Sequence, residues 1–148
     1  MAERFFRSIR LLAQCYQAFE QLSNADVRRT RLTPSQFDII ATLGNTEGMT
    51  FRELGERTLI TKGTLTGVID RLEASGLVRR IAQTDDRRCT LVQLTAAGQQ
   101  EFERVFPAHT KHCARPFLGY TEQDFAALER ELGKLKASLD GAMAASKD

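Results

Sequence analysis

The chain has 148 residues, of which 42% are hydrophobic and 27% are charged, and its formal net charge is +2. These values are ordinary for a soluble globular protein, and the length suffices for one domain with its own core. No apolar run is long enough to cross a bilayer, and Arg7 and Arg10 interrupt an N-terminus that does not resemble a signal peptide. We therefore expect a cytoplasmic protein with no membrane partner. Because the net charge is small, any case for nucleic acid must come from local patterns.

The first predicted element is an amphipathic helix over residues 5–22. Its apolar residues recur in steps of four and three and form one stripe, which comprises Phe5, Ile9, Leu12, Tyr16 and Phe19. Leu11, Cys15, Ala18 and Leu22 widen the stripe. A face of this width needs more than one neighbouring helix.

Two further helices are predicted from their starting signals. Thr33 is suited to cap a helix that begins at Pro34 and ends near Gly44 and Asn45. Thr50 and Glu53 have the spacing of a capping box, which predicts a short helix over residues 51–57.

After a tight turn at Leu59 and Ile60, Thr61 is predicted to cap another helix, which Gly76 ends in a left-handed conformation. The inner face of this helix carries Leu65, Val68, Ile69 and Leu72. Two short helices joined by a tight turn are typical of a helix-turn-helix, in which the second helix reads DNA.

Residues 77–81 and 90–95 form two β-branched runs around a polar tip, and they predict a β-hairpin. The tip carries Asp85, Asp86, Arg87 and Arg88. Arginine suits a narrow minor groove, where the negative potential is strong, and Asp86 has the spacing to hold the guanidinium of Arg88 in place. The alternative is a solvated turn, but a hairpin that follows a helix-turn-helix favours a winged helix-turn-helix that binds DNA.

Two helices are predicted after the hairpin. The first begins at Thr95, carries an apolar stripe through Phe102, Phe106, His109, Cys113 and Phe117, and contains Pro107, which predicts a kink. The second begins at Thr121 and has apolar residues in steps of three and four, a seam for a partner helix, at Phe125, Leu128, Leu132, Leu135 and Leu139.

The exposed face of the helix that follows Thr61 is the predicted DNA-reading surface. Thr61, Lys62, Thr64, Thr66 and Arg71 supply donors that suit phosphates, base edges and thymine methyl groups. Gly63 and Gly67 lie one turn apart on the same helix and cost on the order of 1 kcal/mol each relative to alanine. Close approach to DNA explains them, and so does close packing against another helix.

Other chemistry has weaker support. Cys15, Cys89 and Cys113 lack the spacing of a disulfide framework or a Cys-x-x-Cys zinc site. His109 and Cys113 lie one helical turn apart, so a metal or redox sensor that uses this pair or Cys15 stays open, although packing is the favoured interpretation of all three. His112 lies off the stripe and is expected to be exposed. No phosphate-binding loop and no nucleophile–base motif is present, so we expect no enzyme, no cofactor and no metal.

Taken together, these segments resemble the MarR (multiple antibiotic resistance regulator) family of bacterial transcription factors. The similarity is most specific in LTPSQFDIIATL (residues 32–43), ITKGTLTGVIDRLEASGLVRR (residues 60–80) and DRRCTLVQLTAAG (residues 86–98). The resemblance implies a mostly α, α+β fold: a single domain over residues 1–148 with a winged helix-turn-helix lobe at about residues 32–98. Residues 4–30 and 99–145 would then form the dimerisation helices.

The same resemblance implies function. It implies a homodimer that binds a pseudo-palindromic DNA operator, usually as a repressor, with Arg88 as the minor-groove arginine and Asp86 as its positioning partner. It also implies release by a small phenolic or carboxylate ligand between the dimerisation helices and the lobe. Arg7, Arg10, Gln14 and Tyr16 are the residues we assign to polar contacts with that ligand. The more distant alternative is a helical interaction module that binds no DNA.

Overall fold

The computed structural model describes residues 2–83 and 90–147. In chain order the elements are α1 (Ala2–Val27), α2 (Pro34–Leu43), β1 (Met49–Thr50), α3 (Phe51–Thr58), α4 (Lys62–Ala74), β2 (Val78–Ala82), β3 (Thr90–Leu94), α5 (Ala96–Ala114), the 3-10 helix η1 (Arg115–Phe117) and α6 (Glu122–Ala145). The chain divides into two compact units, Met1–Cys113 and Ala114–Asp148, and each is described by itself. The expected mixture of many helices and few strands is confirmed.

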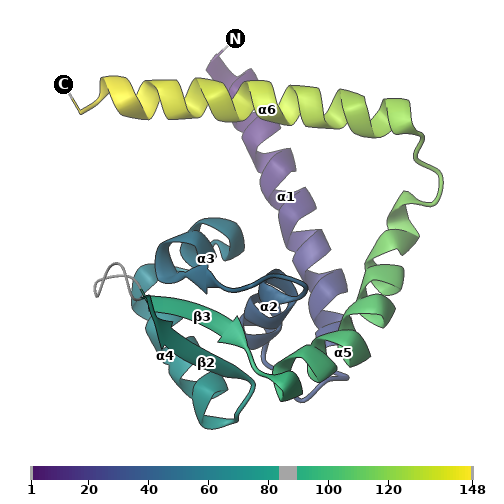
Figure 1. The fold of residues 1–148 in the computed structure, drawn as a ribbon. Coiled ribbons are helices and arrows are strands. Elements are labelled where there is room, and N and C mark those ends of the chain that lie inside the picture. Colours follow the sequence, from purple (N-terminus) through teal and green to yellow (C-terminus); the bar gives the residue numbers. More distant parts are fainter. Residues whose placement is uncertain (1, 84–89, 148) are drawn as a thin grey trace. The chain divides into compact units, whose positions relative to one another are not determined.

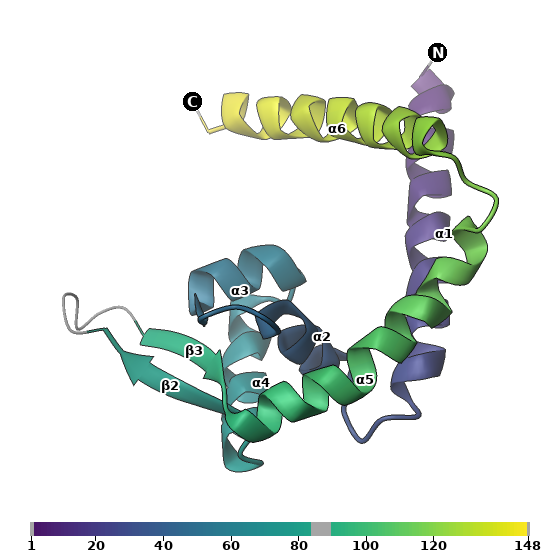
Figure 2. The same cartoon turned by 45° about the vertical axis from the view of Figure 1, so that its right-hand side comes forward.

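The sheet of the first unit is small and antiparallel, with the strand order β1-β3-β2. The hairpin pairs Val78 with Leu94 and Ala82 with Thr90, so both strands lie within one residue of their predicted bounds. β1 was not predicted from the sequence; it adds an edge in which Met49 pairs with Val92. Figures 1 and 2 show α2, α3 and α4 gathered beside this sheet. Helix, turn, helix and hairpin therefore form one lobe.

Side-chain caps begin three of the helices. The hydroxyl of Thr33 accepts a hydrogen bond from the backbone N–H of Gln36, and the side chain of Gln36 accepts one from the backbone N–H of Thr33. Thr50 and Glu53 make the same pair of bonds. Thr121 and Asp124 form the same capping box at the start of α6. These caps satisfy N–H groups that have no partner inside the helix, which is why the starts predicted at Pro34 and after Thr50 are confirmed.

The core of the lobe lies between the helices and the sheet. Its most deeply buried side chains come from α2, α3, α4 and two strands, and they comprise Ile39, Ile40, Leu43, Leu54, Leu65, Ile69, Leu72, Val78 and Val92. Burial of each such side chain contributes about 1.5–3 kcal/mol. The inner face of α4 is therefore held by packing, as its apolar period predicts.

Inside the first unit α5 runs beside the C-terminal half of α1 (Figure 1), and polar contacts join the two helices. His109 Nδ1 lies 3.0 Å from a carboxylate oxygen of Asp26, and His112 Nε2 lies 2.9 Å from the carbonyl oxygen of Leu22. His112 is half-buried because of that contact, so the expectation that it is exposed was wrong. Pro107 lies within α5, where it supplies no N–H to the preceding turn.

Large apolar side chains of α1 remain exposed on the single chain: Phe5, Phe6, Ile9, Leu11, Leu12, Tyr16 and Phe19. In the second unit Leu128, Leu132 and Leu139 of α6 are exposed as well. Exposed apolar stripes of this extent are typical of interaction surfaces. None of the helices in residues 2–83 and 90–147 combines the length and apolar character needed to span a membrane.

Candidate nucleic-acid interface

The outer face of α4 carries the side chains that the sequence assigns to DNA reading. Leu65, Val68, Ile69 and Leu72 are buried on the inner face. All five predicted reading residues are exposed, namely Thr61, Lys62, Thr64, Thr66 and Arg71. The structure therefore leaves all five donors open to solvent along α4 and at its N-cap.

The start of α4 differs from the starts of α2, α3 and α6. Thr61 occupies the N-cap position with an extended backbone, but its side chain makes no capping hydrogen bond. Its hydroxyl instead donates to the hydroxyl of Thr64 over 3.1 Å. The prediction that the helix begins after Thr61 is confirmed, but the capping hydrogen bond that was expected of its side chain is not formed.

The two glycines of α4 face open space. A Cβ atom built on Gly63 or Gly67 would meet no atom within 4 Å, apart from the backbone of the helix itself. Close packing against another helix of the lobe is therefore excluded as their explanation. By contrast, a Cβ on Gly98 would lie 2.0 Å from the carbonyl oxygen of Leu77, so that glycine is required by the fold.

Arg80 on β2 forms ion pairs with α4 and so joins the hairpin to this helix. Arg80 donates to Asp70 over 2.5 Å and to Glu73 over 2.8 Å, and its backbone N–H donates to Glu73 over 3.2 Å. Its guanidinium carbon also lies 5.6 Å from the centre of the Phe51 ring. These contacts set the position of the strand relative to the polar face of the helix. Sequence reasoning missed them, although Asp70 and Glu73 share one helical face and signal a basic partner.

The base of the hairpin is well defined. Arg79 donates to Gln93 across the two strands, and Gln93 donates in turn to the carbonyl oxygen of Glu47 in the preceding loop. Asp86, Arg87 and Arg88, which the sequence assigns to DNA binding, lie outside the described residues. Their assignment stays a prediction.

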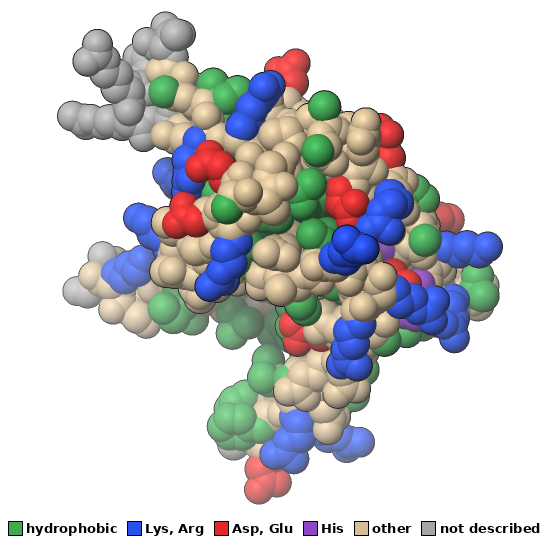
Figure 3. Space-filling model, turned by 90° about the horizontal axis from the view of Figure 1, so that it is seen from below, with side chains coloured by type: hydrophobic (Ala, Val, Ile, Leu, Met, Phe, Trp, Pro, Cys, Tyr) green, Lys and Arg blue, Asp and Glu red, His purple; other side chains and the backbone are tan. Residues whose placement is uncertain are grey.

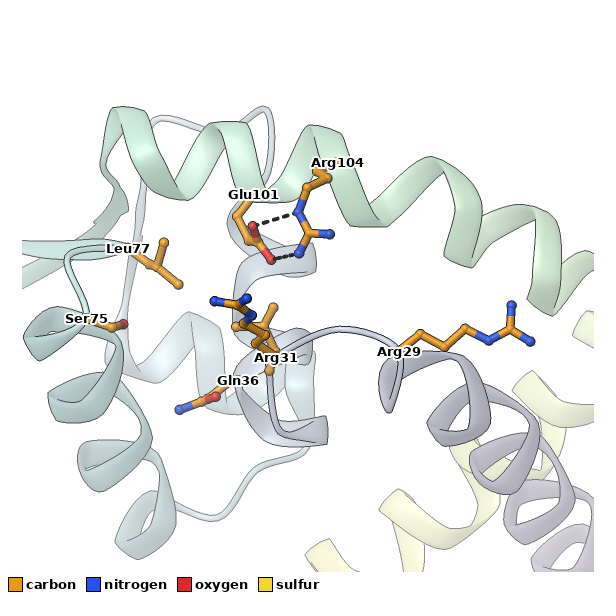
Figure 4. Close-up of a pocket in the computed structure, with 8 residues that line it drawn as sticks. Arg29, Arg31, Gln36, Ser75, Leu77, Glu101 and Arg104 are labelled. Atoms are coloured by element: carbon orange, nitrogen blue, oxygen red, sulfur yellow. Dashed lines mark hydrogen bonds and ion pairs between the residues drawn. The ribbon is translucent and has the colours of Figure 1, made fainter.

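A groove of about 760 Å³ lies on the first unit at the C-terminal end of α4. Seen from below, the molecule shows a hollow with hydrophobic side chains inside and charged side chains at its rim (Figure 3). Figure 4 shows Arg104 of α5 paired with Glu101, while Arg29 points away from that pair. The pair with Glu101 neutralises Arg104, so this residue is not a free cation in the groove.

A smaller cavity of about 150 Å³ lies between α1 and α2. Its lining includes Tyr16, Phe19, Glu20, Phe37 and Asp38. Asp38 as a whole residue is exposed, but its carboxyl group is partly buried, and this burial raises the pKa of the group. The nearby His109 lowers that pKa, whereas the charge of Glu20 raises it further. Burial also raises the pKa of Tyr16, and Glu20 adds to the rise, so its phenol stays a hydrogen-bond donor.

Of the four residues assigned to a ligand from the sequence, only Tyr16 lines this cavity. Arg7, Arg10 and Gln14 lie further toward the N-terminus of α1 and are exposed.

Cys113 and His109 meet as their spacing suggests. The thiol sulfur lies 3.4 Å from His109 Nε2, and Ser23 lies 3.3 Å from the same nitrogen. Burial raises the pKa of the Cys113 thiol above its ordinary value, which disfavours the reactive thiolate. Cys15 is exposed on the single chain rather than packed, and Cys89 lies outside the described residues. No group of three or more potential metal ligands occurs in the described part of the chain.

The comparisons with known proteins agree with this geometry. The model of the MarR family matches residues 32–90. Among curated relatives, which include helix-turn-helix transcriptional regulators of Bacillus subtilis, the homoprotocatechuate degradative operon repressor of Escherichia coli is 33% identical over 94 residues, 64% of each chain.

Two solved structures are similar over most of the chain. AbsC, a MarR family transcriptional regulator from Streptomyces coelicolor, has a TM-score of 0.79 and 26% identity over 90% of this chain and 93% of its own. BpsR of Bordetella bronchiseptica, whose DNA binding is regulated by 6-hydroxynicotinic acid, has a TM-score of 0.72 and 27% identity over 86% of this chain and 91% of its own.

Proposed function

Because the chain belongs to the MarR family of transcriptional regulators, we propose that it represses transcription as a homodimer on a pseudo-palindromic operator. The family and the winged helix-turn-helix lobe account for DNA binding as such. The sign of regulation rests on the likeness to the homoprotocatechuate degradative operon repressor.

The observation that carries the proposal is the composition of the outer face of α4. It combines exposed threonines and Lys62 with two glycines that have empty space above them. Interior glycines destabilise a helix, and no neighbour within the lobe requires these two. A duplex that approaches the backbone closely supplies the reason, since the missing side chains let the helix enter the major groove more deeply.

We assign two parts of the duplex to two parts of the lobe. Thr61, Lys62, Thr64, Thr66 and Arg71 contact the major groove and its phosphates from α4. Asp86, Arg87 and Arg88 contact the adjacent minor groove, with Asp86 holding Arg88 in place. Arg80 pairs with Asp70 and Glu73, and these contacts hold β2, at the base of the hairpin, against the reading helix α4.

The homodimer follows from the exposed apolar stripes of α1 and α6. Ten or more large apolar side chains in water would favour association strongly, at about 25 cal/mol per Å² of apolar surface covered. Each copy then presents one lobe, which matches the two half-sites of a pseudo-palindrome.

A small aromatic compound with a hydroxyl group is the proposed effector, bound in the cavity between α1 and α2. Tyr16, Phe19 and Phe37 supply aromatic walls, while Glu20 and Asp38 can accept from a hydroxyl. The same two carboxyl groups disfavour an unaccompanied carboxylate ligand, so of the two classes implied by the family we propose the phenolic one. The regulator of BpsR, 6-hydroxynicotinic acid, carries a carboxyl group as well as a ring hydroxyl, so it supports an aromatic effector with a hydroxyl group but does not separate the two classes.

Footprinting on the DNA that flanks its own gene, with and without simple phenols, tests this function. The wild-type protein should protect two half-sites, and an active phenol should remove the protection. Lys62→Ala should weaken binding and lower the salt dependence by about one phosphate contact per half-site, whereas Lys111→Ala on α5 should change neither. Binding that shows no preference for any sequence would contradict the proposal.

A further inference from the structure

Leu59, in the turn between α3 and α4, has an unusual backbone conformation. Its φ of 61° and ψ of 11° are left-handed, and it is one of two non-glycine residues with positive φ in the described chain. The other is Asn45, a residue type that tolerates this region. A branched leucine side chain does not, because its Cβ crowds the following carbonyl oxygen.

Nothing in the described chain uses the Leu59 side chain. It is 75% exposed, whereas the next residue, Ile60, packs against the core of the lobe. The turn itself is closed by Thr58, whose hydroxyl donates to the carbonyl of Leu54 over 2.6 Å and accepts from the N–H of Ile60 over 3.3 Å. Glycine would therefore fit this turn with less strain, and a strained, exposed leucine indicates a role outside the fold.

The place of Leu59 identifies the partner. It stands two residues before Thr61, at the end of α4 that carries Lys62 and the open face of Gly63. If the N-terminal end of α4 enters the major groove, the turn that immediately precedes it lies close to the duplex. A leucine side chain has no donor or acceptor, and the apolar group that a major groove offers is the 5-methyl of thymine.

We propose that Leu59 reads a thymine in each half-site by packing on its 5-methyl group. This inference rests on the proposed DNA binding and assigns a specificity-determining residue that lies before the reading helix rather than on it. The strain in the turn is then the consequence of placing an apolar side chain where the fold alone favours glycine.

The test begins with duplexes that the wild-type full-length protein selects from a random pool. Single thymines of the selected duplex are then replaced by deoxyuridine, which lacks only the 5-methyl group. Wild-type affinity should fall about fourfold or more at one thymine per half-site, because each buried carbon contributes about 0.8 kcal/mol. Leu59→Ala, which removes the contact in both half-sites, should bind the unmodified duplex at least as weakly and be indifferent to that replacement, while Leu59→Met should keep the wild-type response.

Leu59→Gly separates the side-chain contact from the geometry of the turn. It should unfold about 2–4 °C above Leu59→Ala, since glycine fits the left-handed position better, yet bind DNA no more tightly. Recovery of affinity in the glycine variant would overturn the inference, because the loss would then come from the turn. The inference would also be overturned if Leu59→Ala lost affinity on replacement of each thymine by deoxyuridine to the same extent as the wild-type protein. If the wild-type protein selects no duplex, the proposed function fails with it.

Discussion

At Gly63 and Gly67, helix stability favours alanine, whereas the proposed close contact with DNA favours glycine. Alanine at either position should raise the free energy of unfolding by about 1 kcal/mol, because it removes the entropic cost of glycine and meets no neighbour. The same methyl groups should weaken operator binding by holding the duplex away. Urea unfolding and DNA titration of the same variants measure the two effects.

Gly98→Ala is the matched control for these variants. Its Cβ would meet the carbonyl oxygen of Leu77 at 2.0 Å, so this change should destabilise the lobe by about 1–3 kcal/mol. Tighter DNA binding by the α4 alanine variants would show that no close approach occurs at those positions.

Arg88 and Asp86, which lie outside the described residues, give the sharpest test of the wing. Arg88→Ala should cost about 1–3 kcal/mol of binding free energy per half-site and lower the salt dependence. Simple electrostatics predicts that Asp86→Ala binds DNA more tightly, whereas a positioning role predicts weaker binding. Titration of both variants against one operator at two salt concentrations distinguishes these cases. Unchanged binding by Arg88→Ala would remove the wing from the interface.

At the scale of elements, the sequence predicts most helix starts because their signals are local. Thr33 with Pro34 and Thr50 with Glu53 lie within one turn of the bonds they make. β1 was missed because two residues show no period, and it exists only through pairing with β3. The links from Arg80 to Asp70 and from His112 to Leu22 join separate elements, so a pattern within one element can suggest that a partner exists but cannot identify it.

The junction of α1 and α5 yields a prediction about the cysteines. Cys113→Ser should leave operator affinity and effector response nearly unchanged, because burial raises the pKa of the Cys113 thiol and disfavours its thiolate. We expect the same of Cys15→Ser, whose residue is exposed on α1. His109→Ala should instead cost about 3 kcal/mol of unfolding free energy, because it leaves the buried Asp26 without its partner. Loss of induction in Cys15→Ser or Cys113→Ser, with DNA binding intact, would replace this interpretation with a thiol sensor.

For the whole molecule, the exposed stripes of α1 and α6 predict that folding and association are coupled. Aspartate at both Leu132 and Leu135 should produce aggregated or unfolded protein, because an obligate dimer seldom keeps a stable monomer. Light scattering and circular dichroism measure the outcome. Lys136→Ala, on the same helix, serves as a control that keeps the apolar seam. A soluble, folded monomer from the double variant would contradict the dimer.

The uncapped start of α4 has a consequence for its amide hydrogen exchange and for the enthalpy and entropy of DNA binding. Without a side-chain cap, the first amide protons of α4 should exchange with solvent faster than those of α2, α3 and α6, which capping boxes hold. A duplex that orders this turn should slow the exchange there more than elsewhere on the helix. Part of the favourable enthalpy of binding would then be offset by the entropy lost in one helical turn, and calorimetry would record folding and recognition as a single event.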